Sequence, residues 1–326
     1  MAGCGGVAQA KWLPAIRYLQ TRSEPIEITG LADPERETRE KVARLYGAPA
    51  YASLEELLRR QRPDLVMVLA PDDQHVALAR QAIEAGIATL VEKPLSRSLA
   101  EAAALADLAE SRGVLLGGVA NKRFSAPYAL AKRLIGSGAL NGEPTLFAGK
   151  FTLGYPYVDI LEAGTVHLLD LALWIMGPIA QVGATGVTGS NGRLESAVAM
   201  LTFRSGAIGS IVTSSAALSF KPWERVEIIG RHAMLTVEDQ LELTLADEEV
   251  GPAKTWRPVI PNTLMFDEAF GGYSGLLENM LDSIRGLVPL VATGRDGVAA
   301  VALIAAIHES IVRGGEPVSN SQEAAS

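Results

Sequence analysis

Between residues 26 and 118 the chain alternates short apolar runs with stretches of helical periodicity, and this alternation limits the possible folds more than any other feature. The run Leu65–Leu69 is apolar at every position, which is typical of a strand covered by helices on both faces. The other predicted strands are Ile26–Ala32, Ala88–Val91 and Val114–Leu116. Strands separated by helices at this spacing pair in parallel, so the pattern predicts a doubly wound α/β sheet.

Helices are expected between these strands, and two of them carry a start signal. Ser53 with Glu56, and Ser98 with Glu101, have the spacing of the capping box, in which side chains satisfy the first N–H groups of a helix. The periodicity also predicts helices at 35–46 and 74–84. We place this first domain at residues 1–120.

Beyond residue 121 the strand-like runs become longer and follow one another with few helices between them. They lie at 145–153, 181–187, 197–203, 206–214, 225–229 and 241–245. The expected helices lie at 127–135, 166–176, 273–284 and 297–312. The order predicts an α+β domain at 121–313, built on an open and mostly antiparallel sheet. Residues 314–326 lack apolar periodicity and are expected to form a frayed tail.

Composition narrows the class of protein. At 326 residues with 48% hydrophobic residues, the chain is long enough for two cores. A net charge of −8 argues against nucleic acids and anionic membranes as partners. The single cysteine fits a reducing compartment, and no apolar stretch approaches the ~20 residues needed to span a bilayer. With no signal-peptide pattern at the start, these features predict a soluble cytoplasmic protein.

A glycine cluster at the start of the chain matches the pattern G-x-G-x-x-G/A over Gly3–Ala8, with glycines at 3, 5 and 6 and Val7 among them. In a Rossmann turn such glycines allow a tight bend and let the backbone approach a pyrophosphate. Asp33 ends the next predicted strand, where a carboxylate accepts the ribose hydroxyls of a dinucleotide; an ordinary turn residue before Pro34 is the alternative. The pattern favours NAD over NADP, although Arg36 is close by.

One departure concerns the strand that should precede this turn. Only Met1 and Ala2 come before Gly3, whereas the central strand of such a sheet has about five residues. Either the true start lies upstream or the sheet lacks its central strand, and we favour the first interpretation.

Two further residues carry possible chemistry. Lys93, in Glu92-Lys93-Pro94, follows a strand at the carboxyl end, where an ammonium group can donate to a substrate oxygen. His167 is the candidate acid/base, because a neutral imidazole suits removal of a hydroxyl proton. A surface lysine and a buried structural histidine are the alternatives. Asp170 lies three residues after His167, on one helical face, and is interpreted as structural.

The remaining histidines and the single cysteine do not suggest a metal site. His232 and His308 have no partners at ligand spacing, and no H-x-x-x-H pair occurs. Neither a P-loop nor a G-x-S-x-G elbow is present, so kinase and hydrolase functions have no support.

Taken together, the glycine turn, Glu92-Lys93-Pro94 and His167-Leu168-Leu169-Asp170 resemble the Gfo/Idh/MocA family of NAD(P)-dependent oxidoreductases over nearly the whole chain. The resemblance implies that Lys93 contacts the reacting hydroxyl and that the cofactor lies against Gly3, Gly5, Gly6, Val7, Asp33, Glu92 and Lys93. It also implies that the loop from Pro71 to His75 lies near the nicotinamide, although His75 is equally well explained as a capping or packing residue.

The chain departs from the family pattern Asp-x-Gly-x-His-x-x-Asp at its first position. Ala163 stands where the aspartate is expected, and Gly164 is one place out of register. Asp159 and Glu162 are candidates to replace the missing carboxylate.

The resemblance therefore implies an NAD(P)-dependent dehydrogenase acting on a secondary hydroxyl of a sugar, inositol or sugar derivative. The alternative is a cofactor-binding sensor or regulator with a decayed site, which Ala163 and the short chain before Gly3 favour. We also expect a homodimer or homotetramer, formed through the sheet of the second domain, because the runs Ala197–Leu201 and Ile208–Val212 have few polar alternations.

Overall fold

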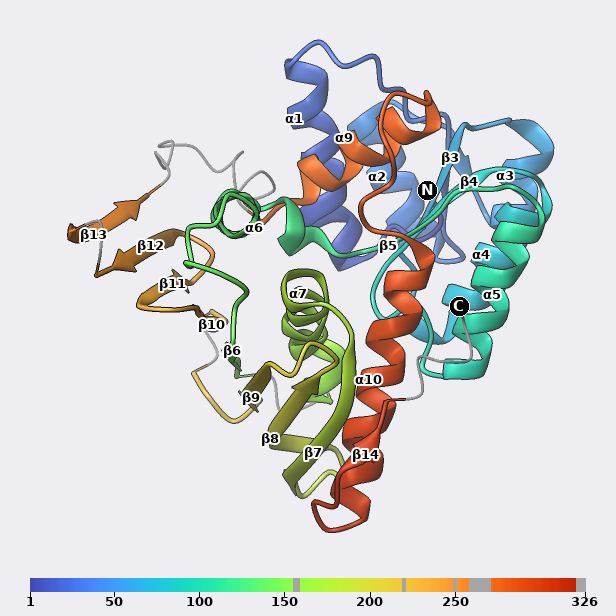
Figure 1. Cartoon of the computed structure of the whole chain (residues 1–326). Coiled ribbons are helices and arrows are strands. Elements are labelled where there is room, and N and C mark those ends of the chain that lie inside the picture. Colours follow the sequence, from blue (N-terminus) through green and yellow to red (C-terminus); the bar gives the residue numbers. More distant parts are fainter. Residues whose placement is uncertain (155–158, 219–220, 249–250, 258–270, 321–326) are drawn as a thin grey trace. The chain divides into compact units, whose positions relative to one another are not determined.

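The computed structural model describes residues 1–154, 159–218, 221–248, 251–257 and 271–320, and the chain divides into two compact units. The first unit contains Met1–Asn121 and Pro261–Val301, and the second contains Lys122–Ile260 and Ala302–Ser326. Figure 1 labels the elements of both. The first unit's opening segment ends at Asn121, one residue beyond the end of the first domain expected from the sequence. The first unit also includes Pro261–Val301, which we had assigned to the second domain.

The first unit is built on a parallel sheet. Its strands are β1 (Leu31–Ala32), β2 (Ala50–Tyr51), β3 (Leu65–Val68), β4 (Ala88–Val91) and β5 (Leu116–Gly118). β1 pairs with β2, and β4 lies between β3 and β5. Ala2 forms parallel bridges to both Ala32 and Val68, so it occupies the position between β1 and β3. The resulting order, β2-β1-Ala2-β3-β4-β5, is that of a Rossmann sheet and confirms the predicted fold class.

The central position of this sheet is short. The Met1 amino group donates to the Gly30 carbonyl at 2.9 Å, and Ala2 exchanges backbone hydrogen bonds with Met67 and Leu69. Beyond them lies a groove of about 290 Å³, lined on its two sides by 26–30 and 63–65. The predicted strand Ile26–Ala32 is therefore reduced to Leu31–Ala32, because the groove takes the place of a pairing neighbour along residues 26–29.

Helices surround this sheet and close its core. They are η1 (Ala8–Trp12), α1 (Leu13–Thr21), α2 (Arg36–Tyr46), α3 (Leu54–Arg60), η2 (Asp72–Gln74), α4 (His75–Glu84), α5 (Leu99–Ser111) and α9 (Tyr273–Ile284). The predicted caps are present: the Ser53 and Ser98 hydroxyls accept from the N–H groups of Glu56 and Glu101 at 3.1 and 3.4 Å. Among the described residues, none of the helices combines the length and the apolarity needed to cross a membrane.

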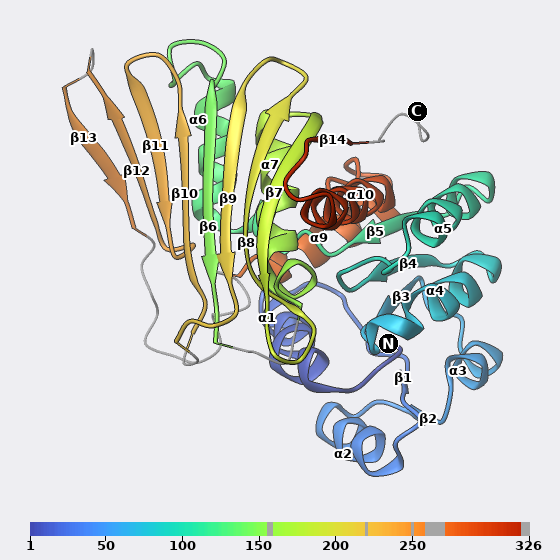
Figure 2. The same cartoon turned by 90° about the horizontal axis from the view of Figure 1, so that it is seen from below.

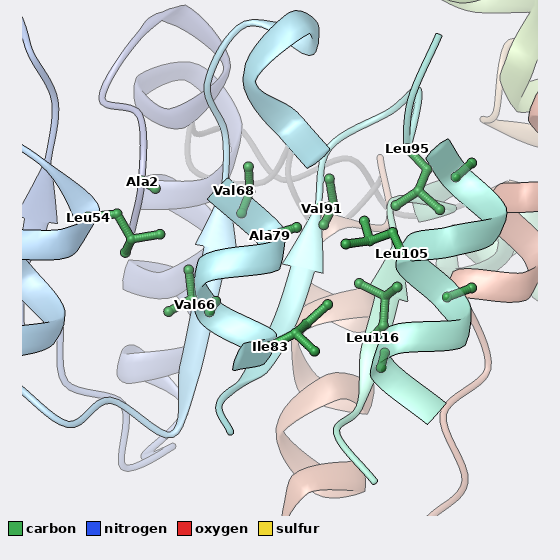
Figure 3. Close-up of a cluster of buried hydrophobic side chains, with 14 of the residues drawn as sticks. Ala2, Leu54, Val66, Val68, Ala79, Ile83, Val91, Leu95, Leu105 and Leu116 are labelled. Carbon is green, nitrogen blue, oxygen red and sulfur yellow. The ribbon is translucent and has the colours of Figure 1, made fainter. Parts of the chain in front are cut away.

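The core of the first unit joins side chains from both strands and helices. Val66, Val68 and Val91 of the strands meet Ile83 of α4 and Leu105 of α5, as Figure 3 shows. Each of these side chains is almost entirely buried, so the apolar runs of the sequence correspond to a core covered by helices.

The segment that we had assigned to the second domain joins the first unit through α1 and η1. Trp12 and Tyr273 meet edge to face with ring centroids 5.1 Å apart, and Arg285 pairs with Glu24 at 3.3 Å. The apolar face of α9, which includes Leu277, is buried. The chain therefore returns to its first unit to complete it, which a boundary drawn from local pattern does not anticipate.

The second unit is built on a nine-stranded sheet in the order β13-β12-β11-β10-β6-β9-β8-β7-β14. Its strands are β6 (Leu146–Thr152), β7 (Ile179–Thr188), β8 (Leu194–Phe203), β9 (Ile208–Ser214), β10 (Trp223–Ile229), β11 (Ala233–Glu238), β12 (Glu242–Asp247), β13 (Gly251–Trp256) and β14 (Val318–Ser319). Among the described strands of this sheet only β6 and β9 pair in parallel, so the prediction of a mostly antiparallel sheet is confirmed. β11, β13 and β14 were not predicted.

Helices cover one face of this sheet. They are η3 (Asn121–Phe124), α6 (Ala126–Gly136), η4 (Leu161–Thr165), α7 (Val166–Met176) and the end of α10 (Gly294–Val312). Figure 2 shows α6 and α7 on one side of the strands. Burial alternates along the strands accordingly: Ala197, Ala199 and Leu201 are buried, while Val198 and Met200 between them are exposed.

The tail is ordered as far as it is described, which corrects the expectation of fraying from residue 314. Val318 is buried and pairs with Val182, and the Asn320 N–H donates to the Ala180 carbonyl at 2.9 Å. These residues are ordered because their backbone pairs with the edge of β7, a contact that apolar periodicity in the sequence cannot reveal. Residues 321–326 lie outside the described residues.

Candidate active site

The turn after Ala2 requires glycine at its first position. Gly3 has φ +99°, and a Cβ there would lie 2.6 Å from backbone atoms of Leu69 and Ala70. The Gly3 N–H donates to the Ala32 carbonyl at 2.8 Å. The chain therefore bends sharply at the carboxyl edge of the sheet, with no room for a side chain.

Gly5 and Gly6 are glycines for a different reason. A Cβ at either position would meet no atom of the described residues within 4 Å, apart from its chain neighbours, and neither residue has a positive φ. Gly6 and Val7 are already helical, and η1 and α1 continue from them. The first N–H groups of a helix have no intrahelical partners and carry partial positive charge. This arrangement leaves open space beside a helix N-terminus, which suits the close approach of a phosphate.

Asp33 braces the glycine turn from the end of β1. One carboxylate oxygen accepts from the Cys4 N–H at 2.8 Å, and the other accepts from the Glu35 N–H at 2.9 Å. Each oxygen can accept a further hydrogen bond, and the side chain is partly exposed. The geometry therefore fits both a carboxylate that binds ribose hydroxyls and an ordinary turn residue. Burial, together with the Asp33 charge, raises the pKa of the Cys4 thiol to about 11.

Lys93 is held by its neighbour in the sequence. Glu92 is 5% exposed; one of its oxygens accepts from the Trp12 indole N–H at 2.8 Å and the other from the Lys93 N–H at 3.0 Å. Trp12 ends η1, so this hydrogen bond ties the loop after β4 to the helix that begins at the glycine turn. Lys93 itself is half-buried, and Pro94 is buried.

His75 joins two loops at the same edge of the sheet. Its side chain is 1% exposed, and its ring nitrogens lie 2.7 Å from the Pro94 carbonyl and 2.9 Å from the Ala70 carbonyl. Arg97 and Asp72 pair at 2.8 Å across the same two loops. His75 therefore ties the loop after β3 to the loop that carries Lys93, while Pro71 before it is exposed.

Sequence reasoning missed Asn121, which follows β5 at this edge. Its amide nitrogen donates to the Gly271 carbonyl at 2.6 Å, and its Oδ1 is buried with no hydrogen-bond partner in the described part of the chain. A buried acceptor without a partner is uncommon and indicates a place for a bound water or a ligand donor. No local pattern in the sequence marks this residue.

His167 lies in the first turn of α7, in the second unit, and is half-buried. Asp170, one turn further, is 6% exposed and accepts two hydrogen bonds from Arg123, at 2.6 and 2.9 Å. This buried bidentate pair fixes α7 to η3. This contact is consistent with the structural role interpreted for Asp170 from the sequence, and its partner Arg123 is a residue that the sequence analysis did not identify.

A second buried ion pair lies close along the chain. Lys122 pairs with Glu224 of β10, and its ammonium group lies 4.9 Å from the centre of the Phe151 ring. The Tyr128 hydroxyl also donates to Glu224. Burial and nearby carboxylates raise the pKa of Tyr128 well above its usual value. These charges have low exposure, so the loss of one partner leaves the other buried and unpaired.

The first unit thus brings together Gly3, Asp33, His75, Glu92 and Lys93 on loops that follow the carboxyl ends of parallel strands. Ligands of open α/β sheets bind at this edge. Of the carboxylates considered near His167, Glu162 lies in η4 and Asp159 just before it. Among the described residues, no group of three His, Cys, Asp or Glu side chains is arranged to hold a metal ion.

The two kinds of glycine predict opposite responses to alanine. Gly3→Ala is expected to lower the free energy of unfolding by about 1–3 kcal/mol or more, because of its positive φ and the backbone contact. Gly6→Ala, the control, adds a methyl group in open space at a helical position and is expected to leave stability unchanged or slightly higher. Urea denaturation of both variants measures the difference, and equal effects would contradict the described turn.

Comparison with known proteins agrees with this geometry. Residues 1–118 match the Gfo/Idh/MocA oxidoreductase family with its NAD-binding Rossmann fold, and residues 128–236 match the C-terminal domain of the same family. Myo-inositol 2-dehydrogenase of Thermotoga maritima is 25% identical, covering 85% of this chain and 86% of the relative. UDP-N-acetylglucosamine 3-dehydrogenase of Acidithiobacillus ferrooxidans is 28% identical, covering 86% and 87%.

Solved structures show the same fold. A levoglucosan dehydrogenase, in complex with NADH and levoglucosan, superposes with a TM-score of 0.87 at 19% identity, covering 98% of each chain. The family models match residues in both units, and the glycine turn at Gly3 leads into a helix N-terminus as a dinucleotide site requires. The chain therefore belongs to the Gfo/Idh/MocA family and is an NAD-dependent oxidoreductase.

Proposed function

We propose that this enzyme transfers a hydride between NAD and a secondary hydroxyl or keto group of a sugar, an inositol or a sugar derivative. The observation that carries the proposal is the glycine turn. No other part of the described chain fills the space beside Gly5 and Gly6, and a helix begins there. A dinucleotide pyrophosphate has the charge and size that such a site accommodates.

The side chains around this turn fit an NAD cofactor. Asp33 stands at the end of β1, where its free lone pairs suit ribose hydroxyls. Its negative charge opposes a 2′-phosphate, and of the nearby cations Arg36 is paired with Glu40 at 2.7 Å. NAD is therefore the proposed cofactor rather than NADP. Bound NAD supplies the hydride acceptor or donor at its nicotinamide ring.

Lys93 and His167 have separate roles in this proposal. Lys93 donates a hydrogen bond to the reacting oxygen of the substrate, and the contacts of Glu92 and His75 hold the loop that carries it. His167 takes the hydroxyl proton when the substrate is oxidised and returns it in the reverse direction. Each group stabilises charge that develops only as the reaction proceeds.

The substrate class rests on the relatives. Two of them are named for myo-inositol and for UDP-N-acetylglucosamine, and a structural neighbour was solved with levoglucosan. All three compounds carry secondary hydroxyl groups on a saturated ring. A polyhydroxylated ring is therefore the proposed substrate class.

Calorimetric titration tests the cofactor assignment. We expect NAD to bind with a dissociation constant in the micromolar range and NADP to bind roughly tenfold more weakly, because Asp33 opposes the added phosphate. If neither dinucleotide gives heat or a thermal shift, the proposed function is wrong.

Substitution of the two catalytic candidates tests their roles. Lys93→Met and His167→Ala are each expected to lower turnover by about 10²–10⁴-fold while NAD affinity stays within a few-fold of the original. The assay follows NAD reduction with a panel that includes myo-inositol, levoglucosan and UDP-N-acetylglucosamine. Lys254→Met and His232→Ala remove the same side chains from exposed positions and serve as controls. Normal turnover in both site variants would refute the assignment.

We further propose that the enzyme is a homodimer or homotetramer formed through the open face of the second unit's sheet. Val198, Met200, Ile208 and Val212 are large apolar side chains exposed on neighbouring strands of that face, with Val198 opposite Val212 in the pairing of β8 with β9. Contiguous exposed apolar side chains of this kind are typical of protein interfaces.

Light scattering measures the assembly directly. We expect a mass of two or four times 34.4 kDa for the original protein, and a lower mass for Met200→Lys, which places a charge in the apolar face. Leu287→Lys is the matched control, because Leu287 of the first unit is also 68% exposed. A mass of 34.4 kDa for the original protein at micromolar concentration would exclude this assembly.

A further inference from the structure

The helix that carries His167 begins with a π-turn, η4. The N–H of Val166 donates to the carbonyl of Leu161, five residues earlier, instead of four as in an α-helix. The Thr165 hydroxyl donates to the Ile160 carbonyl, also five residues earlier, at 2.9 Å. A π-turn holds one more residue than the α-helical turn that it replaces, and such turns often occur at functional sites.

Contacts with the sheet hold one side of this turn. A Cβ on Gly164 would lie 2.0 Å from the Phe151 ring, so the ring of β6 packs directly on the backbone of η4. The buried Thr165 hydroxyl lies 2.6 Å from the Thr213 hydroxyl of β9. Gly164 and Thr165 therefore face the sheet.

The pattern of exposure identifies the opposite side. Between Ile160 and Ala172, only Glu162, Ala163 and His167 are partly exposed, and all other residues are buried. In an α-helix the residue four before His167, which is Ala163, would lie above it on the same face. The π-turn η4 adds a residue just before α7, and Glu162 and Ala163 of this turn share the partly exposed side with His167.

Other carboxylates near this turn contact groups other than His167. Asp159 accepts from the Leu161 N–H at 2.9 Å and lies 3.7 Å from His308. Asp170 is paired with Arg123, and on β10 Glu224 is paired with Lys122. On β6, which packs against α7, Lys150 lies on the exposed face of the sheet.

We propose that Glu162 is a positioning residue for His167, with its carboxylate directed at the imidazole ring. The carboxylate fixes the ring orientation and tautomer and stabilises the imidazolium that forms when His167 takes a proton. The catalytic part of this inference rests on the proposed function, whereas the contact between the two side chains does not.

NMR of the four histidine rings tests the contact without any substrate. In protein with ¹⁵N-labelled histidine, the His167 signals are assigned by their loss in His167→Gln. We expect Glu162→Gln to move the midpoint of the His167 titration to lower pH by roughly one unit, because an adjacent negative charge favours imidazolium. Asp159→Asn is the matched control and is expected to move the His308 signals instead. An unchanged His167 titration in Glu162→Gln would overturn the proposal.

Glu162→Asp separates charge from packing. It keeps the carboxylate and shortens the side chain, so its His167 titration is expected to stay close to that of the original protein. Equal shifts in Glu162→Asp and Glu162→Gln would mean that Glu162 acts only through packing, which would also overturn the proposal.

Turnover with a substrate found in the panel then tests the catalytic consequence. We expect Glu162→Gln to lower kcat at least about tenfold with little change in the KM for NAD. If His167→Ala loses activity but Glu162→Gln alters neither turnover nor ring signals, the inference fails and the proposed function stands. If His167→Ala retains activity, the catalytic role of His167 fails, and the NMR result alone decides the contact.

Discussion

The close approach of Gly3 to the backbone of Leu69 and Ala70 is the constraint on which the first unit depends. Ala2 bridges the strands on both sides, so the chain must leave the sheet at the very next residue. Because Gly3 permits that bend, the following helix starts at the carboxyl edge of the sheet. Trp12, at the end of η1, then donates its indole N–H to Glu92, and this contact holds the loop that carries Lys93.

The apolar periodicity of the sequence predicted much of the fold, but it did not predict the strands at the two edges of the nine-stranded sheet. The strand of Leu65–Val68 and the helix of Val166–Met176 were predicted because their apolar spacing is long and regular. The strand Gly251–Trp256 has no buried residue and contains a proline, so no alternation marks it. Val318–Ser319 is too short to carry a pattern and is a strand only because the edge of β7 accepts it.

Neighbours in the sequence were enough to predict the tight turn at Gly3, whereas the roles of Lys93 and His167 stay predictions. The site could not be predicted where partners are remote: Arg123 and Asp170 are 47 residues apart, and Trp12 and Glu92 are 80 apart. The π-turn η4, which includes Gly164, could not be predicted either, because no local pattern marks it.

The way the chain divides between its two units has a consequence for synthesis. The first unit closes only with residues up to Val301, after the chain has passed through most of the second unit. A fragment ending at Asn121 would lack α9 and expose the side of α1 that α9 covers, where Trp12 meets Tyr273. On the ribosome, the cofactor-binding unit therefore cannot finish folding first, as an N-terminal domain usually does. The apolar side of α1 stays uncovered until α9 has been synthesised.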